Sequence, residues 1–349
     1  MADVNLAAIA ATLATLFEDR ITSQINRSCV ALQLLPVGPG EGKNLQWSIR
    51  VGSGVGTKIA DGADVQAGDY LNDDKIPASL DYGTYHAAFA VTGKALAGAL
   101  ATGNPAELAA LFADELGDAI ERLAKGIQQA LYDGDGTTDA MFGLCATGGP
   151  LDQTGTYAGV DRSTYPLWAS NVDDNGGTPR ALVVDLMRDM RTTVYEACGM
   201  PFDLILTTPA LHAKYGKLMG QERRWVDNVR LRGGKITLDA GFHMLEFDGV
   251  PVVRDVDVPD GEMLFLNSQY LKVCQMPDGI SAVNQSMAMA QLVGSEEEQM
   301  GEGRTKLVAR INPLGRDGDK YKFQLILYPQ LKNRRCNAHG RIKDLDATL

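Results

Sequence analysis

The stretch GNPAELAALFADELGDAIERLAKGIQQALYDGDG, residues 103–136, carries the strongest structural signal in the chain. Asn104 is suited to cap a helix, Pro105 fits its first position, and Glu107 completes a capping box. Hydrophobic side chains then recur at helical spacing along one face: Leu108, Leu111, Phe112, Leu116, Ile120, Leu123, Ile127 and Leu131. The pattern predicts an amphipathic helix over 105–132, roughly 40 Å long at 1.5 Å per residue.

Two predicted strands and a long acidic excursion precede this helix. LQWSIRV (45–51) and YHAAFAVTG (85–93) have the composition of strands. Between them, RVGSGVGTKIADGADVQAGDY (50–70) resembles a phosphate-binding loop, but Thr57 stands where that motif needs glycine and Ile59 replaces its hydroxyl residue. Nucleotide binding is therefore disfavoured. Because an isolated two-stranded ribbon is marginally stable in water, we expect the excursion to lie on another subunit.

Helices and strands alternate on both sides of these elements. We expect a first helix over 4–24, followed by an extended arm that contains Pro36 and Pro39. After the long helix, the pattern predicts a helix over 181–198 with Gly199 as its C-terminal cap, and a helix opened by Pro209. Predicted strands occupy 202–208, 250–256, 263–267 and 321–331. The fold class is therefore α+β.

Charge and composition restrict the possible partners. The net charge of −11 argues against a nucleic-acid clamp, which needs a basic surplus, so any contact with DNA should be loose. Five cysteines are scattered singly, which fits reduced thiols in a cytoplasmic setting. Glu18, Asp19 and Arg20 close the N-terminal apolar run too early for a membrane span, so we expect no membrane partner.

The residues that usually carry catalysis form no recognisable motif. His86 falls in a predicted strand, His212 early in a predicted helix, and His339 in a polar tail. The aspartates at 133, 135 and 139 lack the glycine and glutamate that an EF-hand requires, which favours a helix-ending turn. We expect no catalytic residue, metal or cofactor.

The segment RDVDVPDGE holds Asp255, Asp257, Asp260 and Glu262. Paired carboxylates can perform acid and base chemistry when their surroundings separate their pKa values. A solvated turn between two strands is the favoured interpretation of this segment.

The order of these elements resembles that of the major capsid protein of tailed bacteriophages, whose shell fold is shared with encapsulins and the floor of herpesvirus capsids. Four phrases carry the resemblance: GLCATGG (143–149), TYAGVDRSTYPLWASNV (156–172), DLILTTPALHAKYGKL (203–218) and FDGVPVVRDVDVPDGEMLFLNSQYLKV (247–273). It extends over about 25–335. The resemblance implies an N-terminal helix and arm (1–44), an extended loop (45–92), a peripheral domain (93–139 and 311–349, with the spine helix 105–132) and an axial domain (140–310).

The resemblance also implies a function and partners. The protein is expected to be a structural subunit, not an enzyme, that assembles into pentamers and hexamers of an icosahedral or prolate head around double-stranded DNA. Expected partners are further copies of the chain, a separate scaffolding protein, a portal protein and, where one is present, a decoration protein. Assembly is expected in the cytoplasm of the bacterial host. Expected contacts between subunits are Arg50, Lys58, Asp61, Asp64, Asp69, Arg223, Arg224 and Arg230.

Because the arm begins almost at Met1, we expect no removal of an N-terminal scaffolding segment.

Two alternatives to the capsid function stay open. An encapsulin-type shell would enclose protein cargo, and a peptide of that cargo on the inner wall would reveal it. A soluble α/β enzyme using the carboxylates near Asp255 would instead be a small oligomer with a ligand pocket.

Overall fold

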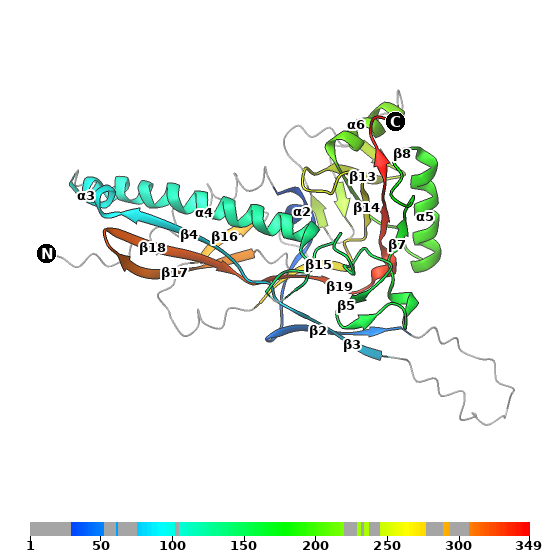
Figure 1. Cartoon of the computed structure of the whole chain (residues 1–349), viewed down its shortest axis with the longest axis horizontal. Coiled ribbons are helices and arrows are strands. Elements are labelled where there is room, and N and C mark those ends of the chain that lie inside the picture. The colour runs from blue at the N-terminus through cyan, green and yellow to red at the C-terminus, as the bar shows by residue number, and fades with distance from the viewer. Residues whose placement is uncertain are drawn as a thin grey trace.

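The structure is a computed structural model that describes residues 29–51, 61, 75–101, 105–137, 139–219, 229–231, 234–236, 245–276, 289–293 and 307–349. The helix predicted over 4–24 lies outside these residues. An elongated part, here called the shaft, joins a rounded part, here called the lobe (Figure 1). Within the described residues, no helix combines the length and apolar character needed to cross a bilayer.

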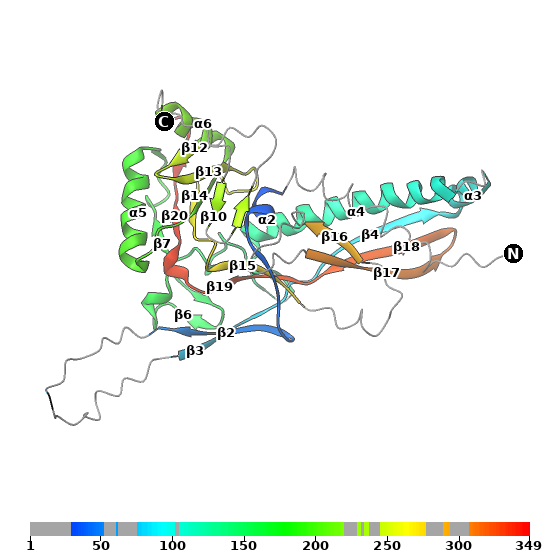
Figure 2. The ribbon, with the colours of Figure 1, turned by 180° about the vertical axis from the view of Figure 1, so that it is seen from behind.

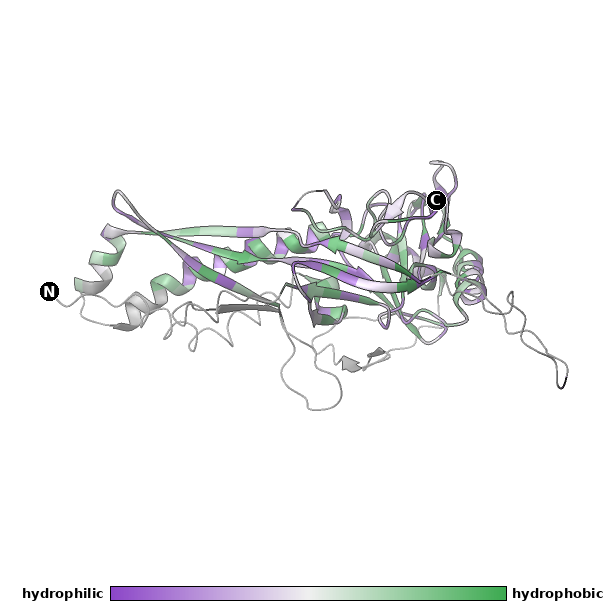
Figure 3. Ribbon diagram, turned by 90° about the horizontal axis from the view of Figure 1, so that it is seen from below, coloured by the Kyte–Doolittle hydropathy of each residue, from purple (hydrophilic) through white to green (hydrophobic). Residues whose placement is uncertain are grey.

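The shaft consists of helices α3 (Gly93–Ala101) and α4 (Pro105–Asp133) and a four-stranded antiparallel sheet. The strand order is β16 (Met289–Val293), β17 (Leu307–Asp317), β18 (Lys320–Leu327) and β4 (Tyr85–Thr92). Phe89 of β4 stacks on Phe323 of β18 with ring centroids 5.1 Å apart, and Phe112 of α4 meets Phe323 edge-on. The predicted long helix is therefore confirmed, and its apolar face covers this sheet. Hydrophobic and hydrophilic residues alternate along the strands (Figure 3).

The lobe is built on a six-stranded mixed sheet. Its order is β12 (Leu245–Phe247), β13 (Val250–Arg254), β9 (Leu204–Thr207), β14 (Met263–Leu266), β20 (Gly340–Ile342) and β7 (Asn171–Asp173). Helices α5 (Val184–Cys198) and α6 (Pro209–Leu218) pack on one face, with α5 beside β7 and β20 (Figure 2). Gly199 ends α5 at φ 72°, and the Thr208 hydroxyl caps α6, as their positions predict.

Both faces of the lobe sheet are buried, which explains why β9 and β14 are apolar at successive positions. Ile205 and Phe265 face the core beneath α5 and α6. Leu206 and Leu264 face the opposite way, into a core that continues along the shaft to Leu131 of α4. One hydrophobic core therefore joins the two parts.

Smaller elements surround the place where shaft and lobe meet. Helix α2 (Val30–Leu34) leads into a three-stranded sheet of β1 (Val37–Pro39), β15 (Leu271–Gln275) and β19 (Pro329–Asn333). Two-stranded pairs are β2 (Asn44–Arg50) with β3 (Lys75–Asp81), β5 (Thr156–Tyr157) with β6 (Val160–Asp161), β8 (Arg180–Ala181) with β21 (Leu345–Asp346), and β10 (Val229–Leu231) with β11 (Gly234–Ile236). Single 3-10 turns are η2 (Pro166–Trp168) and η4 (Cys336–Ala338).

The β2–β3 ribbon forms the base of the excursion, and the expectation that the excursion lies on another subunit concerns residues mostly outside the described chain. The inner side chains of the ribbon, including Ile49, Ala78 and Leu80, pack on Tyr157 and Trp168 of the same chain. The base of the ribbon is therefore stabilised within its own subunit and needs no neighbour to be ordered. Of the excursion beyond it, the structure describes Asp61 alone, as an exposed turn residue.

Strand pairing joins segments that the resemblance places in different domains. Strand β4, expected in the extended loop, pairs with β18 in the shaft. Strands β16 and the start of β17 join the shaft although they fall within 140–310. Strand β20, expected in the peripheral domain, lies between β14 and β7 of the lobe, and the strand predicted over 321–331 is divided at Tyr328. The partners β4 and β18, and likewise β20 and its neighbours β14 and β7, are far apart in sequence, so local patterns do not reveal these pairings.

Candidate functional site

The main polar cluster at the meeting of shaft and lobe centres on Asp255, directly after β13. This carboxylate is 2% exposed. Its Oδ2 accepts hydrogen bonds from Ala31 N (3.2 Å), Gln128 Nε2 (2.6 Å) and Tyr132 OH (2.8 Å), while Oδ1 accepts from Asp257 N (3.1 Å). The solvated-turn interpretation is therefore wrong for Asp255, because α2 and the end of α4 cover it.

Gln128 gives the cluster a second link to α2. Its Oε1 accepts a hydrogen bond from Leu32 N at 3.3 Å, while its Nε2 donates to Asp255. The first turn of a helix has backbone N–H groups without partners inside the helix, and the preceding Cys29 side chain supplies no cap. Gln128 and Asp255 supply those partners from two other segments. We call Ala31, Leu32, Gln128, Tyr132 and Asp255 the Asp255 junction.

Electrostatics fix the protonation of the phenol in the Asp255 junction. Burial, with the nearby charge of Asp255, raises the pKa of Tyr132 well above its ordinary value, so the phenol stays a donor. Burial and the same charge raise the pKa of Asp257. Three donors fill Oδ2 of a buried carboxylate, an arrangement that holds segments together and presents no reactive oxygen to a substrate. The interpretation of Asp255 as an acid–base catalyst has lost its support.

His339 forms a second buried polar contact. The ring is fully buried, which corrects its assignment to a polar tail. Its Nδ1 accepts a hydrogen bond from Asn267 N at 3.1 Å, and Nε2 lies 3.2 Å from Asn333 Oδ1. Burial lowers the pKa of His339 to about 3, so the imidazole is neutral at physiological pH. It links β14, β19 and β20 and has a structural role.

A buried ion pair joins Arg341 of β20 to Glu262, which directly precedes β14. Arg341 Nε is 2.9 Å from Glu262 Oε2, and its Nη2 is 2.5 Å from Glu262 Oε1. Its Nη1 also donates to the carbonyl of Cys145, which follows α4 in the chain. Glu262 is 9% exposed, so it too was wrongly expected in a solvated turn. The bidentate pair ties β20 to the residue before β14, and the Nη1 hydrogen bond ties β20 to the segment after α4.

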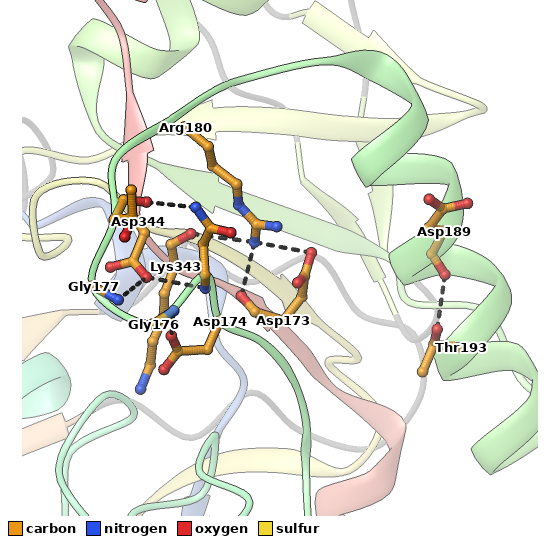
Figure 4. Close-up of polar contacts among 11 residues, drawn as sticks. Asp173, Asp174, Gly176, Gly177, Arg180, Asp189, Thr193, Lys343 and Asp344 are labelled. Atoms are coloured by element: carbon orange, nitrogen blue, oxygen red, sulfur yellow. Dashed lines mark hydrogen bonds and ion pairs between the residues drawn. The ribbon is translucent and has the colours of Figure 1, made fainter.

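A polar loop rich in aspartate and glycine lies at the edge of the lobe (Figure 4). Asp344 Oδ2 accepts hydrogen bonds from Asn175 N (3.0 Å) and Gly177 N (2.8 Å). Arg180 Nη2 lies 2.9 Å from Asp173 Oδ2. The Asp344 carboxylate therefore accepts hydrogen bonds from backbone amides, and the Asp173 carboxylate pairs with the Arg180 guanidinium. Among the described residues, no group of three or more histidine, cysteine, aspartate or glutamate side chains is arranged to hold a metal.

The expected contact residues are only partly within the described chain. Arg50 is exposed at the end of β2, directly opposite Lys75 of β3. Asp61 is exposed. Arg230 lies in β10 opposite Lys235. Lys58, Asp64, Asp69, Arg223 and Arg224 lie outside the described residues.

The outward side of the ribbon is polar except at Pro77. Its exposed side chains are Gln46, Ser48, Arg50, Lys75, Pro77, Ser79 and Asp81. Arg50 and Lys75 face each other in register, and like charges directly opposite in a sheet are destabilising. A surface with such a pair favours an acidic neighbour.

Sequence reasoning missed Gln128 and Tyr132, although a signal was available. Both are polar residues on a face of the long helix that buries Ile127 and Leu131, and they lie four residues apart. A polar pair at this spacing on a buried helical face indicates a shared buried partner. The partner itself, Asp255, could not be identified from local sequence.

A long helix over an antiparallel sheet, joined to a helix-covered lobe, defines the shell subunit of tailed phage capsids, and solved structures confirm this fold. The "Cyanophage A-1(L) capsid asymmetric unit" is 24% identical, with 93% of each chain covered and a TM-score of 0.67. A solved structure of Mycobacterium phage Patience is 13% identical, covering 99% of this chain and 90% of that chain at a TM-score of 0.51.

The SU10 major capsid protein family matches residues 84–290, more than half of the chain, and the chain belongs to this family. It is a major capsid protein of the tailed-phage type, a structural class of protein. The encapsulin of the holo-SrpI complex from Synechococcus elongatus PCC 7942 is also similar, at 14% identity, 90% and 87% coverage and a TM-score of 0.52. That likeness concerns the fold alone. No curated protein sequence matches the chain.

Proposed function

We propose that this subunit assembles with copies of itself into pentamers and hexamers of a closed icosahedral or prolate head around double-stranded DNA. The observation that carries the proposal is the family match over residues 84–290. The joint core of shaft and lobe supports it, because a shell subunit must keep its shape while many moderate interfaces form around it.

The outward face of the β2–β3 ribbon is our candidate contact between subunits. Arg50 and Lys75 form an exposed like-charge pair, and a chain with a net charge of −11 offers acidic surface on every neighbouring copy. Lys58, Asp61, Asp64 and Asp69 would extend this contact along the excursion, and Arg223, Arg224 and Arg230 would form a second basic contact.

The two parts of the subunit suit different places in a shell. We propose the shaft as the peripheral domain and the lobe as the axial domain that surrounds fivefold and sixfold axes. The strand pairing supports boundaries that follow the sheets, with β4, β16, β17 and β18 in the shaft and β20 in the lobe.

Further partners follow from the family. A separate scaffolding protein, a portal protein and, where one is present, a decoration protein are proposed, with assembly in the cytoplasm of the bacterial host and no catalytic activity. The acidic charge supports loose, non-specific contact with the packaged DNA, because an acidic wall does not trap phosphates.

Electron microscopy of the negatively stained, purified protein, with size-exclusion chromatography, tests the proposal. Closed shells, or rings of five and six, are the expected result. If neither forms alone or with a coexpressed scaffolding protein, the assembly proposal is wrong.

Two changes to the ribbon test the contact surface. Deleting 52–69 should leave a folded subunit that forms no shells. Arg50→Glu should weaken assembly, whereas the matched control Lys43→Glu reverses an exposed charge just outside the ribbon and should not. Shells of normal yield from Arg50→Glu would rule out this contact.

A further inference from the structure

Three segments that are distant in sequence meet at one oxygen atom. Oδ2 of Asp255 accepts hydrogen bonds from Ala31 N of α2 and from Gln128 Nε2 and Tyr132 OH of α4. Asp255 itself follows β13, a strand of the lobe sheet, and α4 is the long helix of the shaft. The same atom therefore contacts the shaft, the lobe and the N-terminal side of the chain.

The surroundings of this oxygen are apolar. Leu131, Val253 and Val258 belong to the continuous core around it. Hydrophobic contacts are non-directional, so leucine and valine side chains tolerate small shifts between two packed elements. Hydrogen bonds of 2.6–3.2 Å to a buried carboxylate are directional, and a shift that breaks one leaves a buried polar group unpaired. The polar cluster therefore adds directional restraints to the position that the packed core already limits.

The segment that contains α2 and β1 strengthens this arrangement. Gln128 Oε1 accepts a hydrogen bond from Leu32 N, and Val37 of β1 pairs in parallel with Val273 of β15. The side chains of Ala31, Leu32 and Leu34 are buried in the joint core. The segment therefore crosses the meeting of shaft and lobe, with Asp255 and Gln128 fixing its first helical turn.

We propose that Asp255 sets the angle between shaft and lobe and, through that angle, the curvature and diameter of the shell. The second part rests on the proposed assembly into shells. A closed shell repeats one subunit many times, so a small change of angle in each subunit accumulates over the circumference. Asp255 would then be a residue that determines shell size without lying at any contact between subunits.

Two substitutions and a control test the proposal. Asp255→Asn removes the charge and replaces one acceptor oxygen with an amide donor. Tyr132→Phe removes a single hydroxyl donor and keeps the ring, so it remains informative if Asp255→Asn does not fold. Asp260→Asn makes the same chemical change at an exposed aspartate of the neighbouring turn. Shell diameters from cryo-electron microscopy are compared for wild type and each variant.

We expect both junction variants to fold and to give shells of altered or broadened diameter, with the larger effect for Asp255→Asn and none for Asp260→Asn. Shells of wild-type diameter and uniformity from both junction variants would overturn the proposal, even if the variants melt at lower temperature.

A second measurement separates this inference from the assembly proposal. Hydrogen exchange of the Ala31 and Leu32 amides is followed in the unassembled subunit. Asp255→Asn should speed this exchange by about tenfold or more, the loss expected for a hydrogen bond to a charged group, and Asp260→Asn should not. Unchanged exchange refutes the role of the Asp255 junction whether or not shells form. If Asp255→Asn exchanges faster but the wild-type protein forms no shells, the result would count against the assembly proposal alone.

Discussion

His339 makes the stability of the subunit depend on pH by a calculable amount. Burial lowers its pKa from 6.5 to about 3. Below pH 6.5 the imidazole of the unfolded chain takes a proton, whereas the imidazole of the folded chain stays neutral until near pH 3. The unfolded state therefore binds more protons than the folded state between pH 6.5 and pH 3. The free energy of unfolding therefore falls on acidification, by about 2 kcal/mol between pH 7 and pH 5, since each pKa unit corresponds to about 1.4 kcal/mol.

Urea unfolding of the unassembled subunit at pH 7, 6 and 5, followed by circular dichroism, measures this effect. His339→Gln does not titrate, and its amide offers an acceptor toward Asn267 N and a donor toward Asn333. The variant should be less stable than wild type at pH 7 but should lose about 2 kcal/mol less between pH 7 and pH 5. His86→Gln, which removes an exposed imidazole of β4, is the control. The same pH dependence in wild type and His339→Gln would refute the reasoning.

Three further substitutions test the core and its buried charges. Ile127→Ala should lower the free energy of unfolding by about 2–5 kcal/mol in urea unfolding, because α4 cannot collapse onto the cavity; a cost below about 1 kcal/mol would contradict a packed helix. Arg341→Met leaves Glu262 buried without its partner and should lower the free energy of unfolding by about 3–5 kcal/mol. Adding Glu262→Leu should recover much of this loss, and no recovery would mean that the two residues are not coupled. Asp257→Asn should raise the melting temperature at pH 7, because burial and the charge of Asp255 raise the pKa of Asp257 and so disfavour its ionised form in the folded chain. This gain should vanish below pH 3.8, where the carboxyl group is protonated in the unfolded chain too. An equal gain at both pH values would exclude this cause.

The elements that local sequence predicts well are those whose signals lie within one turn or one strand. The apolar face of α4 needs only spacing, and Gly199 at φ 72° and Pro209 after the Thr208 cap need only their immediate neighbours. The bounds of α4 and α5 and the start of α6 were accordingly predicted within a few residues.

The buried polar groups were beyond local sequence for a physical reason. Asp255 lies in a segment dense in charge, which usually indicates solvent exposure, yet Ala31 and Gln128, 224 and 127 residues away, cover it. His339 is surrounded in sequence by polar residues and becomes buried because the next strand, β20, enters the lobe sheet. Burial at these positions is decided by long-range pairing, which a short window of sequence cannot contain.

The same long-range pairing has a consequence for synthesis of the protein on the ribosome. Strand β4 obtains its neighbour only when residues 320–327 have been made, and β14 is joined to β7 only through residues 340–342. Until then both sheets present open edges, which pair readily with other chains, and contacts of such separation form slowly. Completion of translation therefore precedes completion of folding. A chain that stops early lacks β20 as well as the buried His339 and Arg341, so its lobe sheet stays divided between β14 and β7.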